Sequence, residues 1–126
     1  MSANASTVER LIDAYCAAWN EPDATQRAAQ LEAVWSPGAA YTDPRAHAVG
    51  VAQLSAHIGR ILERRPGARV VRTSAIDEHH GLVRFAWRVV EADGNELPEG
   101  IDFAELAPDG RIARIIGFFG PLGPRA

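Results

Sequence analysis

The sequence predicts an α+β domain in which about three helices from the first half of the chain pack on a curved, mainly antiparallel sheet. Two observations favour this fold class. Apolar residues repeat at helical spacing in three segments before residue 65, and β-rich runs separated by turn dipeptides follow. Helices first and a long run of strands after them is the element order of α+β domains. With 126 residues the chain has the length of one domain, so we expect one unit over residues 1–126 with its core over about 6–120.

The first helix is expected from Ser6 to about Asn20. Ser6 and Glu9 form a capping box, in which each side chain can bond the backbone amide of the other residue. Apolar residues then recur every three or four positions, and this face includes Tyr15 and Trp19. Both aromatic side chains should therefore point into the domain.

The second helix is expected from Asp23, a favourable N-cap residue, to about Trp35. The sequence Ser36-Pro37-Gly38 should stop it. A short strand over residues 39–42 and a turn at Asp43-Pro44 should come next.

The third helix is expected from Val51 to about Arg64, where Pro66-Gly67 closes it. His57 lies at the edge of its apolar face, and two interpretations are open. It is either an acid or base in a pocket or a boundary histidine with a local partner.

Four strands are expected in the second half of the chain, beginning near Val70. Asp93-Gly94 and Asp109-Gly110 are hairpin turn dipeptides. The strands around them should form an antiparallel meander over residues 81–92, 96–107 and 111–120.

Composition excludes several function classes. The net charge of −3 comes with no basic stripe, so nucleic acid is not an expected partner. No apolar run is long enough to span a membrane and no leader pattern begins the chain, so we expect a cytoplasmic protein without a membrane partner. All 13 basic residues are arginine, which excludes a lysine Schiff base and the lysine of a phosphate-binding loop.

No metal and no cofactor are expected either. Cys16 is the single cysteine, so it cannot form an internal disulfide, and on a helix it should be core filling. His79 and His80 are adjacent at a predicted turn and point apart, which makes them a poor metal pair. His47 is expected in a loop.

Three stretches of sequence occur in an informative order. They are residues 14–23 (AYCAAWNEPD), residues 41–44 (YTDP) and residues 100–120, which contain Asp102 and end in Gly117-Phe118-Phe119-Gly120. In order and spacing they resemble the nuclear transport factor 2-like superfamily, which includes ketosteroid isomerases and SnoaL-like polyketide cyclases. This resemblance covers nearly the whole chain and implies a cone-shaped fold that encloses an apolar pocket.

The resemblance also implies site residues. Tyr15, Asp43 and Asp102 fall at the positions of the isomerases' helix tyrosine, base aspartate and protonated aspartate. In ketosteroid isomerase the base aspartate works with an oxyanion hole made by a tyrosine and a neutral aspartate. Two departures stand out: the stretch from Tyr15 to Asp43 is a few residues longer here, and residues 45–48 (RAHA) place basic groups where the isomerases are more neutral.

Each of the three has a plainer interpretation. Tyr15 can be an amphipathic core residue whose hydroxyl is satisfied locally. Asp43 before a proline can simply start an Asx-turn. Asp102 can make a purely structural hydrogen bond, although a carboxyl that faces the helices needs a partner or a proton.

Large side chains on converging faces are expected to line a pocket for a small hydrophobic molecule, with core packing as the alternative. Gly117 should leave a gap among them or mark a bulge. The opposite sheet face should carry Phe103, Arg84 and Arg88, and it would be the dimer interface of an expected homodimer. The expected lining residues are Trp19, Trp35, His57, Phe85, Trp87, Gly117 and Phe119.

The favoured function is a cofactor-free enzyme that acts by proton transfer on a hydrophobic carbonyl compound, as an isomerase, an aldol-type cyclase or a dehydratase. The alternative is a non-catalytic ligand-binding or dimerisation module of the same fold. A third interpretation is epoxide hydrolysis by two aspartates bridged by an arginine. It requires Arg84 or Arg88 to turn inward beside Asp102.

Overall fold

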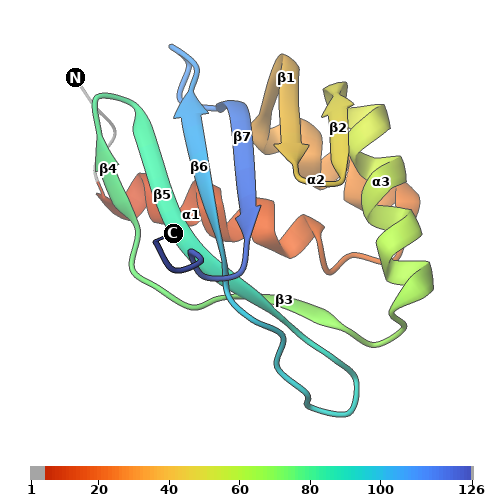
Figure 1. The fold of residues 1–126 in the computed structure, drawn as a ribbon. Coiled ribbons are helices and arrows are strands. Elements are labelled where there is room, and N and C mark those ends of the chain that lie inside the picture. Colours follow the sequence, from red (N-terminus) through yellow and green to blue (C-terminus); the bar gives the residue numbers. More distant parts are fainter. Residues whose placement is uncertain (1–4, 126) are drawn as a thin grey trace.

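Three helices and seven strands make up residues 5–125, the part of the chain that the computed structural model describes, with side chains from residue 7 on (Figure 1). The expectation of three helices packed on a curved, mainly antiparallel sheet is confirmed. Ser6 of the expected capping box lies outside the described side chains. In chain order the elements are α1 (Ala5–Ala18), α2 (Ala24–Val34), β1 (Trp35–Asp43), β2 (Ala46–Val49), α3 (Gly50–Arg64), β3 (Arg69–Arg72), β4 (Asp77–His79), β5 (Leu82–Val90), β6 (Gly100–Leu106) and β7 (Ile112–Phe119).

The strands form one mixed sheet in the order β2-β1-β7-β6-β5-β3, with β4 paired to β5 beyond this path. β1 runs parallel to β7, and the other neighbours are antiparallel. Figure 1 shows α1 and α2 behind the sheet and α3 beside β2. The helices therefore cover one face of the sheet and leave the other open.

Polar side chains fix where the helices meet. Asp23 caps α2 as expected, because its carboxylate accepts the Gln26 amide at 2.9 Å. Arg27 is 4% exposed and donates to the Ser55 carbonyl at 3.1 Å and to the Glu21 carbonyl at 2.8 Å. A Cβ on Gly59 would lie 2.8 Å from the Arg27 guanidinium, so a glycine in α3 makes room for this link between helices.

Two expectations for the first half of the sheet are wrong. The second helix ends near Trp35 as expected, but the strand expected over residues 39–42 is longer. β1 begins at Trp35, so residues 36–38 lie inside it, and a register shift between Trp35 and Ala40 accommodates them. His47 lies in strand β2 rather than in a loop, and its ring nitrogen is 2.8 Å from the Thr42 hydroxyl. The pattern Ala-His-Ala-Val has little β signal, so the tight turn after Asp43 creates this strand by pairing it with β1.

The second half contains five strands instead of four. Residues 69–79 divide into β3 and β4, which pair with different parts of β5. β6 begins at Gly100 rather than at residue 96, and only a single bridge joins Glu96 to Val90. Both turn dipeptides are confirmed as turns, because Gly94 and Gly110 have φ near +90°, a conformation that favours glycine.

The register determines which residues share the face toward the helices. Three rows cross the sheet on that face: Phe119–Gly100–Trp87, then Asp43–Gly117–Asp102–Phe85, then Tyr41–Ile115–Ala104–Val83. The third row belongs to the buried core, where it is packed by side chains of α1, α2 and α3. The first two rows lie toward the ends of β1 and β7.

The opposite face carries the residues expected there. Phe103 is 40% exposed, and Arg84 and Arg88 each bond an acidic side chain, Asp77 and Glu96, at 2.8 Å. Across the described residues, no helix is both long and apolar enough to cross a membrane.

Candidate functional site

Three neighbouring strands place Asp43, Gly117 and Asp102 in one row. Gly117 pairs directly with Asp102, and the parallel register of Thr42 with Ile116 puts Asp43 on the other side of Gly117. A Cβ on Gly117 would lie 2.8 Å from Asp102 Oδ1 and 3.6 Å from Asp43 Cβ. The glycine therefore makes the space in which the Asp102 carboxyl lies, and no side chain separates the two acidic residues.

Asp102 is a buried carboxyl with one hydrogen-bond donor. It is 6% exposed, and Oδ1 accepts the Trp87 indole N–H at 2.9 Å. Burial raises the pKa of Asp102 to about 7; the Trp87 bond opposes this and the charge of Asp43 adds to it. A large share of Asp102 is therefore protonated near neutral pH, which leaves Oδ2 to carry the proton.

Gly100 allows the Trp87 indole to reach Asp102. Gly100 pairs with Trp87 across β5 and β6, and a Cβ on it would lie 2.7 Å from a carbon of the indole ring. A larger residue there would push the indole away. Two glycines thus shape the surroundings of one carboxyl.

Asp43 is held by donors on both of its oxygens. The Tyr41 hydroxyl donates to Oδ2 at 2.5 Å, and the Arg45 backbone N–H donates to Oδ1 at 2.7 Å. The second bond is the Asx-turn expected from the Asp-Pro sequence. Asp43 is half-buried, so the turn fixes a carboxyl in the same row as Asp102 without closing it off from solvent.

Tyr15 lies on α1 with its ring stacked on Trp35 at 5.9 Å between centroids. The side chain is buried, and its hydroxyl makes no hydrogen bond of good geometry with a described residue. Burial and then the nearby Asp102 charge raise the pKa of Tyr15 well above its usual value. A buried hydroxyl without a partner costs about 1–3 kcal/mol, so this group is available to donate to a bound molecule.

A second aromatic group connects Tyr15 to α3. Trp19 lies edge-on to both Tyr15 and His57, and Tyr41 contacts Trp19 and His57 at 5.3 and 5.9 Å between centroids. His57 Nε2 is buried, with no partner among the described residues. Burial lowers the pKa of His57, and the charge of Asp43 opposes this. His57 is therefore neutral at pH 7.

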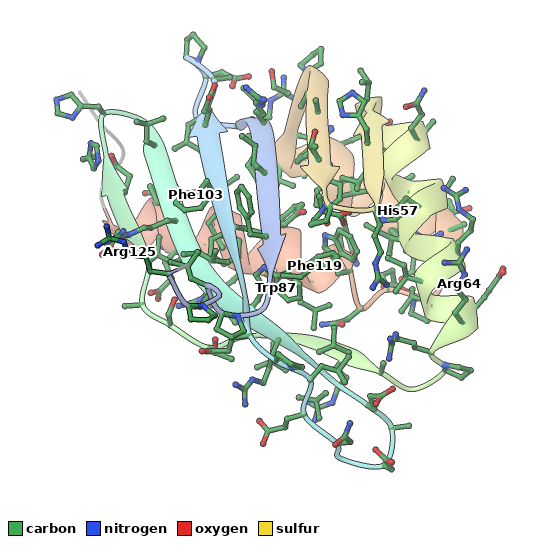
Figure 2. The ribbon with its side chains drawn as sticks, in the orientation of Figure 1. His57, Arg64, Trp87, Phe103, Phe119 and Arg125 are labelled. Atoms are coloured by element: carbon green, nitrogen blue, oxygen red, sulfur yellow. The ribbon has the colours of Figure 1, made fainter. Side chains whose placement is uncertain are left out.

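The remaining expected lining residues lie around the carboxyl row. Phe85 is buried and pairs with Asp102, whereas Trp35 lies behind Tyr15 and donates to the Ala39 carbonyl at 3.1 Å. Trp87 meets Phe119 edge-on at 5.9 Å, and Phe119 is 43% exposed. Figure 2 shows Trp87 and Phe119 close to the end of β7 and His57 on α3.

Neither a cysteine nucleophile nor a metal site is supported in this region. Burial raises the pKa of the Cys16 thiol to about 12, so it is not a thiolate at neutral pH. Within residues 5–125 no three or more histidine, cysteine or acidic side chains are grouped so that they could hold a metal ion.

Tyr41 is a site residue that the sequence analysis missed. It lies in the YTDP stretch, two positions before Asp43, and residues two apart in a strand share a face. That alternation was the available signal. Its use required a strand that extends through Asp43, whereas the expected strand ended at residue 42.

The sequence profile of the SnoaL-like domain matches residues 12–115. The chain belongs to the SnoaL-like family. Among solved structures, it is similar to a candidate isomerase of this family from Agrobacterium tumefaciens strain C58, with 30% identity and a TM-score of 0.87. That similarity covers 92% of this chain and 99% of the other.

More distant structures support the SnoaL-like fold alone. A protein of unknown function with a cystatin-like fold from Methylobium petroleophilum PM1 is 20% identical, with a TM-score of 0.78, 100% of this chain and 82% of that one covered. A candidate SnoaL-like polyketide cyclase from Jannaschia sp. CCS1 is 15% identical, with a TM-score of 0.65 and coverages of 87% and 85%. None of the curated proteins matches the chain in sequence.

Gly117→Ala should disturb this SnoaL-like site directly. The added methyl group would lie 2.8 Å from Asp102 Oδ1, so the carboxyl must move and its bond from Trp87 weakens. We expect a loss of about 1–3 kcal/mol in the free energy of unfolding, measured by urea denaturation. Gly123→Ala, which meets nothing within 4 Å, is the matched control and should leave stability unchanged. Equal stability of the two variants would contradict the close packing of Asp102 over Gly117.

Proposed function

We propose that this protein is a cofactor-free enzyme that transfers a proton on a small hydrophobic carbonyl compound, as an isomerase, an aldol-type cyclase or a dehydratase. One observation carries the proposal: Asp43 and Asp102 flank Gly117 in different surroundings, because Asp43 is half-buried with a donor on each oxygen, whereas Asp102 is buried and burial raises its pKa to about 7. Two carboxyls in different surroundings can divide the roles of base and acid. The candidate isomerase from Agrobacterium, 30% identical, adds support for this class of reaction.

In the proposed reaction Asp43 is the base. Its carboxylate takes a proton from the carbon next to the substrate carbonyl, the C–H electron pair forms the enolate, and negative charge develops on the oxygen. The Tyr15 hydroxyl and the protonated Asp102 would donate hydrogen bonds to that oxygen. Return of the proton from Asp43 to the same or another carbon completes an exchange or an isomerisation. Tyr41 would keep Asp43 oriented through its bond to Oδ2.

The second candidate is a ligand-binding module without catalysis. It is favoured by Trp19, which is packed among Tyr15, Tyr41 and His57, and by the existing bond from Trp87 to Asp102. In this case the same residues would form a binding surface only.

Epoxide hydrolysis is not supported by the arrangement of the arginines. Arg84 bonds Asp77 and Arg88 bonds Glu96 on the opposite sheet face, so neither bridges Asp43 and Asp102.

Hydrogen–deuterium exchange separates catalysis from binding. Methyl 4-oxo-4-phenylbutanoate is a neutral, apolar ketone, and the loss of the proton signal next to its ketone in D₂O is followed by NMR. We expect protein-dependent exchange that saturates with ketone, and a rate about 100-fold lower in Tyr15→Phe because one oxyanion donor is lost. Binding without exchange above the buffer rate would support the ligand-binding module and overturn the enzyme.

We further propose that a second copy of this chain covers the open sheet face. Phe118 and Phe103 are 54% and 40% exposed there, and their rings meet edge-on at 6.2 Å. Exposed aromatic groups of this kind are typical of protein interfaces. Sedimentation should give a dimer for the natural chain and a monomer for Phe118→Ser; a monomeric natural chain would overturn this proposal.

A further inference from the structure

Three arginines near the Asp43 end of the site have no carboxylate partner in the described part of the chain. They are Arg45, Arg60 and Arg64. Arg45 follows the Asp43 turn, and its guanidinium carbon lies 5.9 Å from the centre of the Phe119 ring. Arg60 and Arg64 lie three and seven residues after His57 on α3, close enough for their charges to lower the pKa of His57.

Several arginines elsewhere on the domain are paired. Five of them bond acidic side chains elsewhere on the molecule: Arg65, Arg72, Arg84, Arg88 and Arg111. Arg114 also has no carboxylate partner among the described residues, but it lies on the opposite sheet face, whereas these three cations lie on one side of the candidate site. Even with Glu63 of α3 counted beside Asp43, three cations stand against two carboxylates, which favours an anion there.

Apolar rings and a free nitrogen lie beside these cations. Phe119 and Trp87 form an aromatic pair of which Phe119 is 43% exposed, and His57 Nε2 is buried with no described partner. Figure 2 shows Arg64 near the end of α3, with His57 further back along the same helix. A molecule that satisfied this set would have an apolar body, polar oxygens and a negative charge.

We propose that the carbonyl compound carries a carboxylate, which Arg45 receives together with Arg60 or Arg64 while the apolar part of the molecule lies against Phe119 and Trp87. This inference rests on the proposed function and specifies its substrate class. Guanidinium groups bind carboxylates through paired N–H donors and keep their charge at all relevant pH values.

A carboxylate fits this place better than a phosphate group. Phosphate sites commonly use several backbone N–H groups, and the Arg45 amide is already bonded to Asp43. A doubly charged group would also be repelled more strongly by the Asp43 carboxylate. The arginines are exposed side chains, which suits one charge at the edge of a site.

A matched pair of ligands tests the inference. The probes are 4-oxo-4-phenylbutanoate and its neutral methyl ester, with binding followed by quenching of tryptophan fluorescence at low salt. We expect the acid to bind about tenfold more tightly than the ester, and this preference should shrink as salt is added. Arg45→Gln and the double variant Arg60→Gln/Arg64→Gln should each weaken binding of the acid about five- to tenfold or more, whereas binding of the ester should change much less.

Arg114→Gln is the control, because it makes the same charge change at an exposed position whose side chain lies on the opposite sheet face. Equal affinity for acid and ester, or an equal loss of acid binding in Arg114→Gln, would overturn the inference. So would phenyl phosphate binding more tightly than the acid. If the ester undergoes exchange but the acid is not preferred, the proposed function stands and this inference fails. If the acid is preferred but neither probe undergoes exchange, the carboxylate site stands and the proposed enzyme function fails.

Discussion

Asp43→Asn should reduce proton exchange at the carbon next to the ketone by about 100- to 10,000-fold, the range by which a positioned base contributes to catalysis. The amide has nearly the same shape as the carboxylate. Its one oxygen can still accept the Arg45 N–H and its NH₂ can donate to the Tyr41 hydroxyl oxygen, but it cannot take up a proton. The rate of exchange is measured by NMR in D₂O with the neutral ketone ester.

The control for this variant is Asp77→Asn, which makes the same chemical change on the opposite face, where Asp77 bonds Arg84 at 2.8 Å. Its exchange rate should equal that of the natural chain. Ligand affinity separates the roles further: Asp43→Asn should bind the ester with unchanged affinity, because the base acts on the reaction step rather than on binding. A rate unaffected by Asp43→Asn would contradict the assignment of the base.

The overall architecture could be predicted because its signals are local. Helical spacing of apolar residues places α1, α2 and α3, and the dipeptides at 93–94 and 109–110 mark the turns that stand before β6 and β7. Strands β2 and β4 were not predicted, because short strands with small or charged residues carry almost no periodic signal. These strands exist because they pair with β1 and β5, and that pairing cannot be read from the residues of β2 and β4 themselves.

The acidic residues of the candidate site could be predicted from the sequence. The glycines that shape the surroundings of Asp102 could not. The resemblance pointed to Asp43 and Asp102, and alternation placed Asp102 on the inner face. The roles of Gly100 and Gly117 depend on which side chains lean over them from neighbouring strands. Such contacts follow from register across three strands, and no periodicity within one segment reveals them.

The unpaired cations are a similar case. The basic residues after Asp43 were visible as a departure from the isomerase pattern, but their position relative to Arg60 and Arg64 depends on how α3 packs against β1 and β2. Arg27 illustrates the same limit. Its sequence position suggests an exposed helix residue, whereas the fold buries it against backbone carbonyls of α3 and of the segment before α2.

Asp102→Asn should gain stability relative to the natural chain as the pH rises from 5 to 8. The pKa of Asp102 is raised from 3.8 to about 7 in the folded state. A carboxyl whose pKa is raised on folding favours the folded state while it is protonated, and this contribution is lost as the pH rises from the unfolded pKa through the folded one. The asparagine carries no charge at any pH and keeps an oxygen that can accept the Trp87 N–H.

The free energy of unfolding of the two proteins is compared by urea denaturation at several pH values. Between pH 5 and pH 8 the stability of Asp102→Asn relative to the natural chain should rise by roughly 2–3 kcal/mol, from the raised pKa and its conversion at 1.36 kcal/mol per unit. Because the charge of Asp43 helps to raise the pKa of Asp102, the same comparison made in an Asp43→Asn background should show a smaller change with pH. A difference that stays constant from pH 5 to pH 8 would mean that Asp102 is ionised throughout, and the neutral donor required for the enolate oxygen would then be absent.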